Sequence, residues 1–257
     1  MLAAQFSVMT ARPLLVFDFD GVIVDGMAEY WWSASMAAQR LHGDPDGLDP
    51  HEVPEGFRCL RPWVHHGWEM VLLAAEMPRL DLERWTTDYS AEQAGALQRR
   101  GWSATRLQEA LDQTRQQAVG TDRDAWLGLH QPFPGLVDRL QALPGEGLDW
   151  AVLTTKTAAF TAELLESLGL QPWRLDGREA GPKPEVLLRL QRERVLAGFV
   201  EDRRATLETV RDTEGLQGLP CWLASWGYLK PSDREGLPPG IRLIDPDQLA
   251  APLAHWP

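Results

Sequence analysis

Five short apolar runs constrain the fold of this chain more than any other feature of its sequence. They are 14–18 (LLVFD), 149–154 (DWAVLT), 196–200 (LAGFV), 221–224 (CWLA) and 241–244 (IRLI). Continuous apolar runs of this length predict strands that are buried on both faces, as in a parallel sheet. Between the second and third runs, Phe160, Leu164 and Leu168 recur at helical spacing, and Gly169 follows as a stop signal. We therefore predict an α/β fold, a doubly wound parallel sheet with a Rossmann-like core, whose ligands bind at the carboxyl ends of the strands.

Residues 27–131 interrupt this pattern, because helical stretches dominate there and no continuous strand-like run occurs. The stretches of helical character are 27–41, 66–77, 103–119 and 121–130. In the third stretch, Thr105 and Gln108 have the spacing of a capping box. We predict that residues 1–26 and 132–257 form an α/β catalytic core and that 27–131 form an inserted α-helical cap.

The net charge argues against nucleic acid and anionic membranes as partners. The 257 residues include 25 Lys and Arg against 37 Asp and Glu, a formal net charge of −12, so the overall field repels phosphate-rich surfaces. No apolar run reaches the roughly 18 residues of a membrane span. Residues 1–11 lack the basic start of a signal peptide, and two cysteines are too few for a disulfide framework. We expect a cytoplasmic protein that acts on a small molecule, with its oligomeric state left open.

Reactive side chains follow three of the predicted strands. Asp18 and Asp20 end the first run in the string DFDGVIVD, where Gly21 permits a sharp turn. After such a turn, two carboxylates can approach one phosphoryl group from different sides. Further along, Thr154 and Thr155 end the second run, Lys183 lies in GPKPE, and Glu201 and Asp202 follow the third run. Each residue alone has an ordinary structural explanation, so the order of the whole set carries the signal.

This ordered set resembles the four sequence motifs of the haloacid dehalogenase-like superfamily. Those motifs are DxDG, a threonine at a strand end, a lysine before a helix and an acidic pair at a strand end, and they occur here in the same order. Asp25 and the helical insertion after the first motif extend the resemblance over nearly the whole chain. The resemblance implies a hydrolase of phosphoric monoesters, since the second Asp of DxDG separates phosphorus chemistry from the dehalogenase branch.

The same resemblance implies a role for each motif residue. Asp18 is expected to attack phosphorus and form an aspartyl-phosphate, while Asp20 protonates the leaving oxygen and later deprotonates water. Thr154 is expected to hydrogen-bond the phosphoryl oxygens, with Thr155 as the neighbouring alternative. Lys183 is expected to neutralise part of the anionic charge. The expected cofactor is Mg²⁺, held by Asp18, the backbone carbonyl of Asp20, Asp202 and Glu201.

The fourth motif departs from the family pattern. The usual motif is Gly-Asp with a second Asp four residues on, but this chain has Glu201 and Asp202 followed by Thr206. Either Glu201 supplies the second carboxylate from the adjacent position, or fewer charges hold the metal and bind it more weakly. The sequence leaves both alternatives open.

Substrate recognition is assigned to the predicted cap. The segment FRCLRPWVHHGWE contains Arg58, Arg61 and Trp63. Two guanidinium groups suit a second anionic group on the substrate, and the tryptophan suits a pocket wall. The alternative is that the two arginines offset nearby acids at the rim. Lys156 is similarly ambiguous, since it either touches the substrate or is a solvated lysine at a helix start.

Three functions are compatible with these residues. The leading prediction is a Mg²⁺-dependent phosphatase that acts on a small phosphorylated metabolite. A phosphomutase of the β-phosphoglucomutase type shares the motifs, but it needs sugar-binding cap residues that are not identified in this sequence. A catalytically weak relative that binds a phospho-ligand or a partner is the third alternative, because the second acid of the fourth motif is missing.

Overall fold

The structure is a computed structural model that describes residues 11–42 and 49–257. It divides into two compact units. The core unit comprises the chain up to Ile23 and from Pro132 onward, and the helical unit comprises Val24–Gln131. Residues 1–10, on which the prediction of no signal peptide depends, lie outside the described residues. Within the described ranges, every helix is too short or too polar to cross a membrane.

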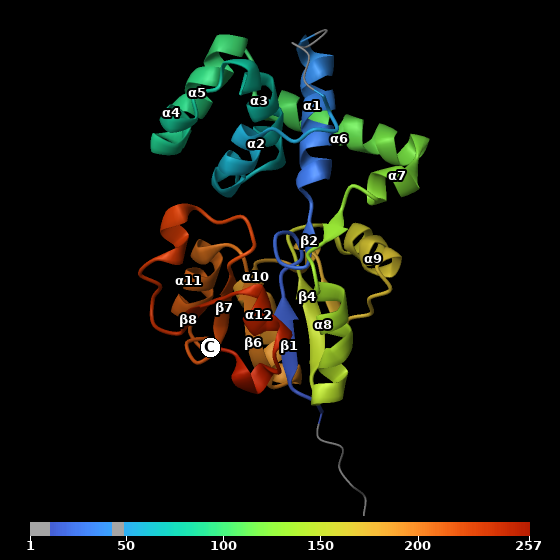
Figure 1. The fold of residues 1–257 in the computed structure, drawn as a ribbon, viewed down its shortest axis with the longest axis vertical. Coiled ribbons are helices and arrows are strands. Elements are labelled where there is room, and N and C mark those ends of the chain that lie inside the picture. The colour runs from blue at the N-terminus through green and yellow to red at the C-terminus, as the bar shows by residue number, and fades with distance from the viewer. Residues whose placement is uncertain (1–10, 43–48) are drawn as a thin grey trace, which may run out of the picture. The chain divides into compact units, whose positions relative to one another are not determined.

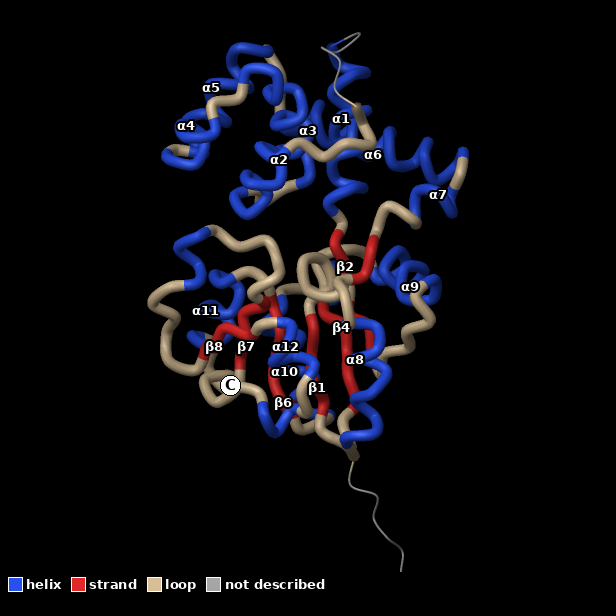
Figure 2. The backbone as a smooth tube through the Cα atoms, viewed as in Figure 1, coloured by secondary structure: helices blue, strands red, loops and turns tan. Residues whose placement is uncertain are grey.

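A six-stranded parallel sheet forms the centre of the core unit (Figure 1, Figure 2). The strand order is β5-β4-β1-β6-β7-β8, and each neighbouring pair is parallel. The strands are β1 (Leu14–Phe17), β4 (Asp149–Leu153), β5 (Arg174–Asp176), β6 (Leu196–Glu201), β7 (Cys221–Ala224) and β8 (Ile241–Ile244). The predicted Rossmann-like α/β fold is confirmed, and β5 is the strand of this sheet that the prediction missed.

Strand β1 lies between β4 and β6, so the residue that follows it has neighbours on both sides. Phe17 at the end of β1 pairs with Val152 of β4 and with Val200 of β6. All four side chains of β1 are fully buried, as expected for a central strand covered on both faces. The carboxyl ends of the three strands therefore meet at one edge of the sheet. The residues at that edge are Asp18, Thr154 and Glu201.

Helices of the core unit cover both faces of this sheet (Figure 1). The α-helices are α8 (Leu136–Ala142), α9 (Ala158–Ser167), α10 (Lys183–Glu193), α11 (Arg204–Asp212) and α12 (Pro246–Ala250), and the short 3-10 helices are η3 (Leu143–Glu146), η4 (Arg178–Ala180), η5 (Pro231–Arg234) and η6 (Leu253–His255). Val186 of α10 and Leu207 of α11 belong to one buried cluster with Val16 of β1. Phe17, which points to the other face, meets Trp150 edge-on with 6.5 Å between ring centroids.

The chain leaves and re-enters the core unit at adjacent points. The amide of Phe133 donates to the carbonyl of Ile23 at 3.0 Å. The neighbouring residues form a two-stranded sheet of β2 (Val24–Asp25) and β3 (Gln131–Pro132). The helical unit is thus an insertion whose two ends pair with each other. That it works as a cap stays a prediction.

Three packed helices, α1 (Met27–His42), α3 (Gly67–Glu76) and α6 (Ala104–Thr121), form the framework of the helical unit. The smaller elements are α2 (Glu55–Leu60), α4 (Leu82–Thr87), α5 (Tyr89–Arg100) and α7 (Arg123–Leu127), with the 3-10 helices η1 (Arg61–Trp63) and η2 (Met77–Arg79). Glu29 of α1 is buried, and Arg115 of α6 donates to both of its oxygens at 2.7 and 2.8 Å. Ser33 donates to the same carboxylate at 2.5 Å. A buried charge that is paired and hydrogen-bonded in this way links α1 to α6.

The start of α6 differs from the predicted capping box at Thr105. Ser103 is the N-cap residue, and its hydroxyl accepts a hydrogen bond from the amide of Arg106 at 3.2 Å. Thr105 lies inside the first turn. The prediction placed the cap two residues too late, because a serine directly before the helical stretch already satisfies one of the exposed amides.

Candidate active site

Asp18 stands directly after β1 at the carboxyl edge of the sheet and is buried. The amide of Phe19 donates to Asp18 Oδ1 at 2.7 Å. The amide of Ile23 donates to the carbonyl of Phe19 at 2.9 Å, which closes a tight loop. Gly21 has a φ of +80° in this loop, a left-handed conformation that glycine adopts without steric cost. The DxDG string therefore folds as a turn that depends on its glycine.

Lys183 contacts two carboxylates at the carboxyl ends of neighbouring strands. It is the first residue of α10, and its Nζ lies 2.9 Å from Asp18 Oδ1 and 2.6 Å from Glu201 Oε2. All three side chains are about nine-tenths buried or more. These charge-assisted contacts are screened little by water. The structure thus brings the expected nucleophile and the expected lysine together.

Burial dominates the titration of this group. Burial, assisted by the negative charge of Glu201 and opposed by Lys183, raises the pKa of Asp18 to about 7. Burial also raises the pKa of Glu201, against the effect of Lys183. For Lys183, burial acts to lower the pKa, but the charges of Asp18 and Glu201 outweigh it, so the pKa lies above its ordinary value. The surrounding charges therefore favour the protonated form of Lys183, whereas burial favours the neutral forms of Asp18 and Glu201.

Asp18, Glu201 and Asp202 form an acidic cluster. Each offers one carboxylate oxygen, and these oxygens lie within 4.8 Å of one another. All three residues are buried. One lysine against three carboxylates leaves an excess of two negative charges when all are ionised. Buried charge needs a partner, so the cluster fits a divalent cation that prefers oxygen ligands.

The two oxygens of Glu201 have protein partners. Oε2 contacts Lys183, and Oε1 accepts the amide hydrogen of Arg203 at 3.0 Å. Glu201 therefore orients the lysine and fixes the turn that leads from β6 into α11.

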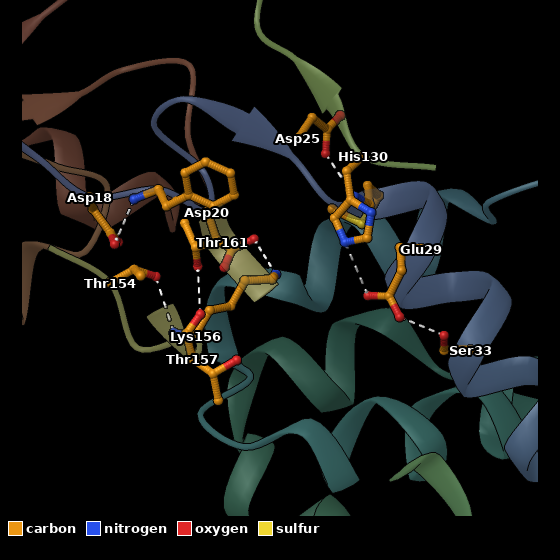
Figure 3. A network of polar contacts seen from close by, with 12 residues as sticks. Asp18, Asp20, Asp25, Glu29, Ser33, His130, Thr154, Lys156, Thr157 and Thr161 are labelled. Carbon is orange, nitrogen blue, oxygen red and sulfur yellow. Dashed lines mark hydrogen bonds and ion pairs between the residues drawn. The ribbon is translucent and has the colours of Figure 1, made fainter. Parts of the chain in front are cut away.

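Thr154 and Lys156 connect the end of β4 to the DxDG loop (Figure 3). Thr154 is buried, and its Oγ1 accepts the amide hydrogen of Lys156 at 3.1 Å. Thr155 is exposed. Lys156 Nζ lies 2.6 Å from Asp20 Oδ1. Figure 3 shows Asp18, Asp20, Thr154 and Lys156 gathered in one place, which favours Thr154 over its neighbour as the phosphoryl ligand.

Sequence reasoning missed two contacts of this site. One is the ion pair of Lys156 with Asp20, and the other is the amide of Tyr228, which donates to Asp202 Oδ2 at 2.9 Å. The sequence feature that pointed to Lys156 as a site residue was its position two residues after Thr154, at the end of the same strand. The amide of Tyr228 carries no residue-type signal in the sequence, and it reaches Asp202 because β7 and β6 are neighbours in the sheet.

Arg58, Arg61 and Trp63 lie in the helical unit, in α2 and η1. Arg58 is exposed, whereas Arg61 and Trp63 are partly buried. The guanidinium carbon of Arg61 lies 4.9 Å from the centroid of the Tyr30 ring, a distance typical of cation–π contacts. Their role in substrate binding stays a prediction.

Comparison with known sequences identifies related hydrolases. The sequence model described as haloacid dehalogenase-like hydrolase matches residues 13–195. The phosphoglycolate phosphatase of Agrobacterium fabrum is 28% identical over 171 residues, which are 63% of this chain and 57% of that enzyme. The phosphoglycolate phosphatase of Pseudomonas putida is 24% identical over 235 residues, which are 85% of this chain and 71% of that enzyme. This chain therefore spans little more than half of the length of the first of these relatives.

Solved structures with the same fold bear related names. A haloacid dehalogenase-like family protein from Streptococcus pneumoniae superposes with a TM-score of 0.55 at 17% identity, covering 94% of this chain and 98% of its own. A haloacid dehalogenase-superfamily hydrolase from Geobacter sulfurreducens superposes with a TM-score of 0.54 at 17% identity, covering 92% and 93%. At such identities the likeness shows the fold alone. The sequence model is described as a hydrolase, and the curated relatives are named as phosphatases.

Proposed function

The chain belongs to the haloacid dehalogenase-like hydrolase family, and on that basis we propose that it is a Mg²⁺-dependent phosphatase of a small phosphorylated metabolite. The observation that carries the proposal is the contact of Lys183 Nζ with Asp18 Oδ1 at 2.9 Å, inside a buried cluster of three carboxylates. A carboxylate held beside a cation, at the edge where parallel strands end, suits attack on an electrophilic phosphorus.

The reaction proceeds in two displacements on phosphorus. In the first, a carboxylate oxygen of Asp18 forms a bond to phosphorus while the bond to the leaving oxygen breaks, and Asp20 gives that oxygen a proton. In the second, a water oxygen forms a bond to phosphorus while the bond from phosphorus to the Asp18 oxygen breaks, Asp20 takes a proton from the water, and inorganic phosphate leaves the regenerated Asp18 carboxylate. One residue thus acts first as general acid and then as general base.

Charge neutralisation decides whether Asp18 can attack. A phosphate monoester brings about two further negative charges to a cluster that is already in excess of negative charge. Asp18, Asp202 and the backbone carbonyl of Asp20 would hold Mg²⁺, which supplies Lewis-acid stabilisation of the phosphoryl oxygens when bound. Glu201 keeps Lys183 in place beside Asp18. In this proposal Glu201 acts on the metal site through the lysine, which corresponds to the alternative in which fewer charges hold the metal.

Thr154 and Lys156 organise the part of the phosphoryl site that follows β4. The Thr154 hydroxyl accepts from the amide of Lys156, so its own hydrogen is available to a phosphoryl oxygen. Lys156 holds the carboxyl of Asp20 through the contact of 2.6 Å. Asp20 therefore has a defined orientation before the substrate arrives, as a general acid requires.

The substrate class is a small phosphate ester. The net charge of −12 disfavours nucleic acid as a substrate, so an anionic ligand depends on local cations. We assign Arg58 and Arg61 to a second anionic group of the substrate, with Trp63 as an apolar wall. The curated relatives are named for phosphoglycolate, which carries such a second group, and 2-phosphoglycolate is therefore the first compound to assay.

The test is phosphate release from a panel of phosphorylated metabolites and p-nitrophenyl phosphate, with and without Mg²⁺. We expect turnover that EDTA abolishes and that Asp18→Asn removes almost completely. Asp245→Asn, on an acid that caps α12, serves as the matched control. Turnover retained by Asp18→Asn would reject the nucleophile. Conversion of a sugar phosphate to its isomer without net phosphate release would contradict the hydrolase assignment.

A further inference from the structure

The segment Ser225–Leu229 (SWGYL) follows β7 and belongs to none of the four sequence motifs, yet it contacts the fourth-motif acid directly. The backbone amide of Tyr228 donates to Asp202 Oδ2 at 2.9 Å. Because β7 is the sheet neighbour of β6, the segment emerges beside the strand that carries Asp202. One of the two oxygens of that carboxylate is thereby fixed by a main-chain group.

Two glycines approach Asp202 so closely that neither position has room for a side chain. A Cβ added to Gly227 would lie 2.3 Å from the Asp202 Cβ and 2.6 Å from the Gly21 carbonyl oxygen. A Cβ added to Gly21 would lie 1.9 Å from Asp202 Oδ2. Real Cβ atoms essentially never approach other heavy atoms within 3.0 Å. The side chain of Asp202 is therefore held between the DxDG loop and the segment 225–229 by direct backbone contact.

The segment itself is anchored on both sides. The indole Nε1 of Trp226 donates to the carbonyl of Val22 at 3.0 Å, which ties the segment to the DxDG loop. The amide of Ser225 donates to the carbonyl of Ile244 at 2.9 Å, which ties it to the end of β8. A support bonded to the loop and to the sheet moves little, so it can hold a carboxylate in one orientation.

We propose that the segment 225–229 positions Asp202 for cation binding. The amide of Tyr228 fixes one carboxylate oxygen, and Gly227 lets the backbone approach the side chain closely. The inference rests on the proposed Mg²⁺-dependent function. Fixing Oδ2 by an N–H group sets the direction of the remaining oxygen, so the ligand geometry exists before the ion arrives. Outer groups that orient a metal ligand typically change metal affinity by about 10- to 100-fold when they are lost.

The test measures Mg²⁺ binding to the apoprotein by isothermal titration calorimetry, independently of turnover. Gly227→Ala should raise the Kd for Mg²⁺ by about 10- to 100-fold. Gly218→Ala is the matched control, because a Cβ there meets nothing within 4 Å, and it should bind like wild type. Tyr228→Phe keeps the amide and should also bind like wild type. In the phosphatase assay, Gly227→Ala should require more Mg²⁺ for half-maximal rate.

The outcomes separate this inference from the proposed function. If wild type binds Mg²⁺ and folded Gly227→Ala binds it equally well, the positioning role is overturned while the phosphatase proposal stands. If wild type binds no Mg²⁺, the proposed metal dependence fails and the inference fails with it. Should Gly227→Ala not fold, Trp226→Phe decides, because it removes only the indole hydrogen bond to Val22. It should raise the Kd about threefold to tenfold, and an unchanged Kd would overturn the inference.

Discussion

Asp18→Asn should make the metal-free protein more stable at neutral pH while it abolishes turnover. The pKa of Asp18 is raised from 3.8 to about 7, chiefly by burial. At about 1.36 kcal/mol per pH unit, this corresponds to a penalty of about 4 kcal/mol for holding the ionised carboxylate in the folded state. Asparagine has nearly the same shape and no charge, so the folded variant does not incur the cost of a buried ionised carboxylate. Its Oδ1 can still accept from the amide of Phe19 and from Lys183.

The pH dependence follows from the direction of the shift. The folded state holds the Asp18 proton up to about pH 7, whereas the unfolded state releases it near 3.8. Between these values the folded state binds more protons, so the contribution of this group to stability is present below pH 3.8 and is lost as pH rises through 7. The stability advantage of Asp18→Asn should therefore grow by roughly 3 kcal/mol from pH 5 to pH 8.

Urea denaturation in EDTA at pH 5 and pH 8, for wild type and Asp18→Asn, measures this difference. Saturating Mg²⁺ should stabilise wild type and shrink the gap, since a cation bound to the folded state compensates the same charge. A variant that is no more stable than wild type at pH 8, or an advantage that does not change with pH, would refute the reasoning. Asp245→Asn again controls for the loss of an exposed carboxylate.

Three further substitutions test other contacts. Lys183→Met leaves Asp18 and Glu201 without their shared cation and should lower the unfolding free energy at pH 8 by about 3–5 kcal/mol in urea denaturation; an unchanged midpoint would contradict the ion pair. Lys156→Met should lower kcat about 10- to 100-fold with little effect on the denaturation midpoint. Lys156→Arg should recover part of the rate in the phosphate-release assay. Equal rates in wild type and both variants would contradict the role assigned to this lysine. Glu29→Gln should cost the helical unit about 2–4 kcal/mol, because Arg115 loses its bidentate partner; thermal melting measures it, and a melting point equal to wild type would show that the pair contributes nothing.

The sheet could be predicted from the sequence because its central strands are apolar on both faces. The runs at 14–18 and 196–200 correspond to β1 and β6, the strands whose ends carry Asp18 and Glu201. Strand β5 was missed because Arg174 and Asp176 occupy two of its three positions, and these two charges pair with each other at 2.8 Å. An edge strand of this length has no apolar periodicity to detect.

The candidate site was predictable in its members but not in its contacts. Motif order identified Asp18, Thr154, Lys183 and Glu201, yet nothing in a linear sequence tells which carboxylate a lysine will reach. Lys183 reaches both Asp18 and Glu201 only because β1 and β6 are neighbours in the sheet. The amide of Tyr228 was beyond prediction for a similar reason, since a main-chain donor carries no residue-type signal.

The paired ends of the helical unit bear on how such a protein diversifies. Because Phe133 bonds to Ile23 across the junction, the sheet order on either side of β1 does not depend on what is threaded between those residues. A segment of another length or sequence, joined at the same two points, would leave the carboxyl edge of the sheet intact. Descendants of one ancestor could therefore exchange the whole insertion while they inherit the same order of strands.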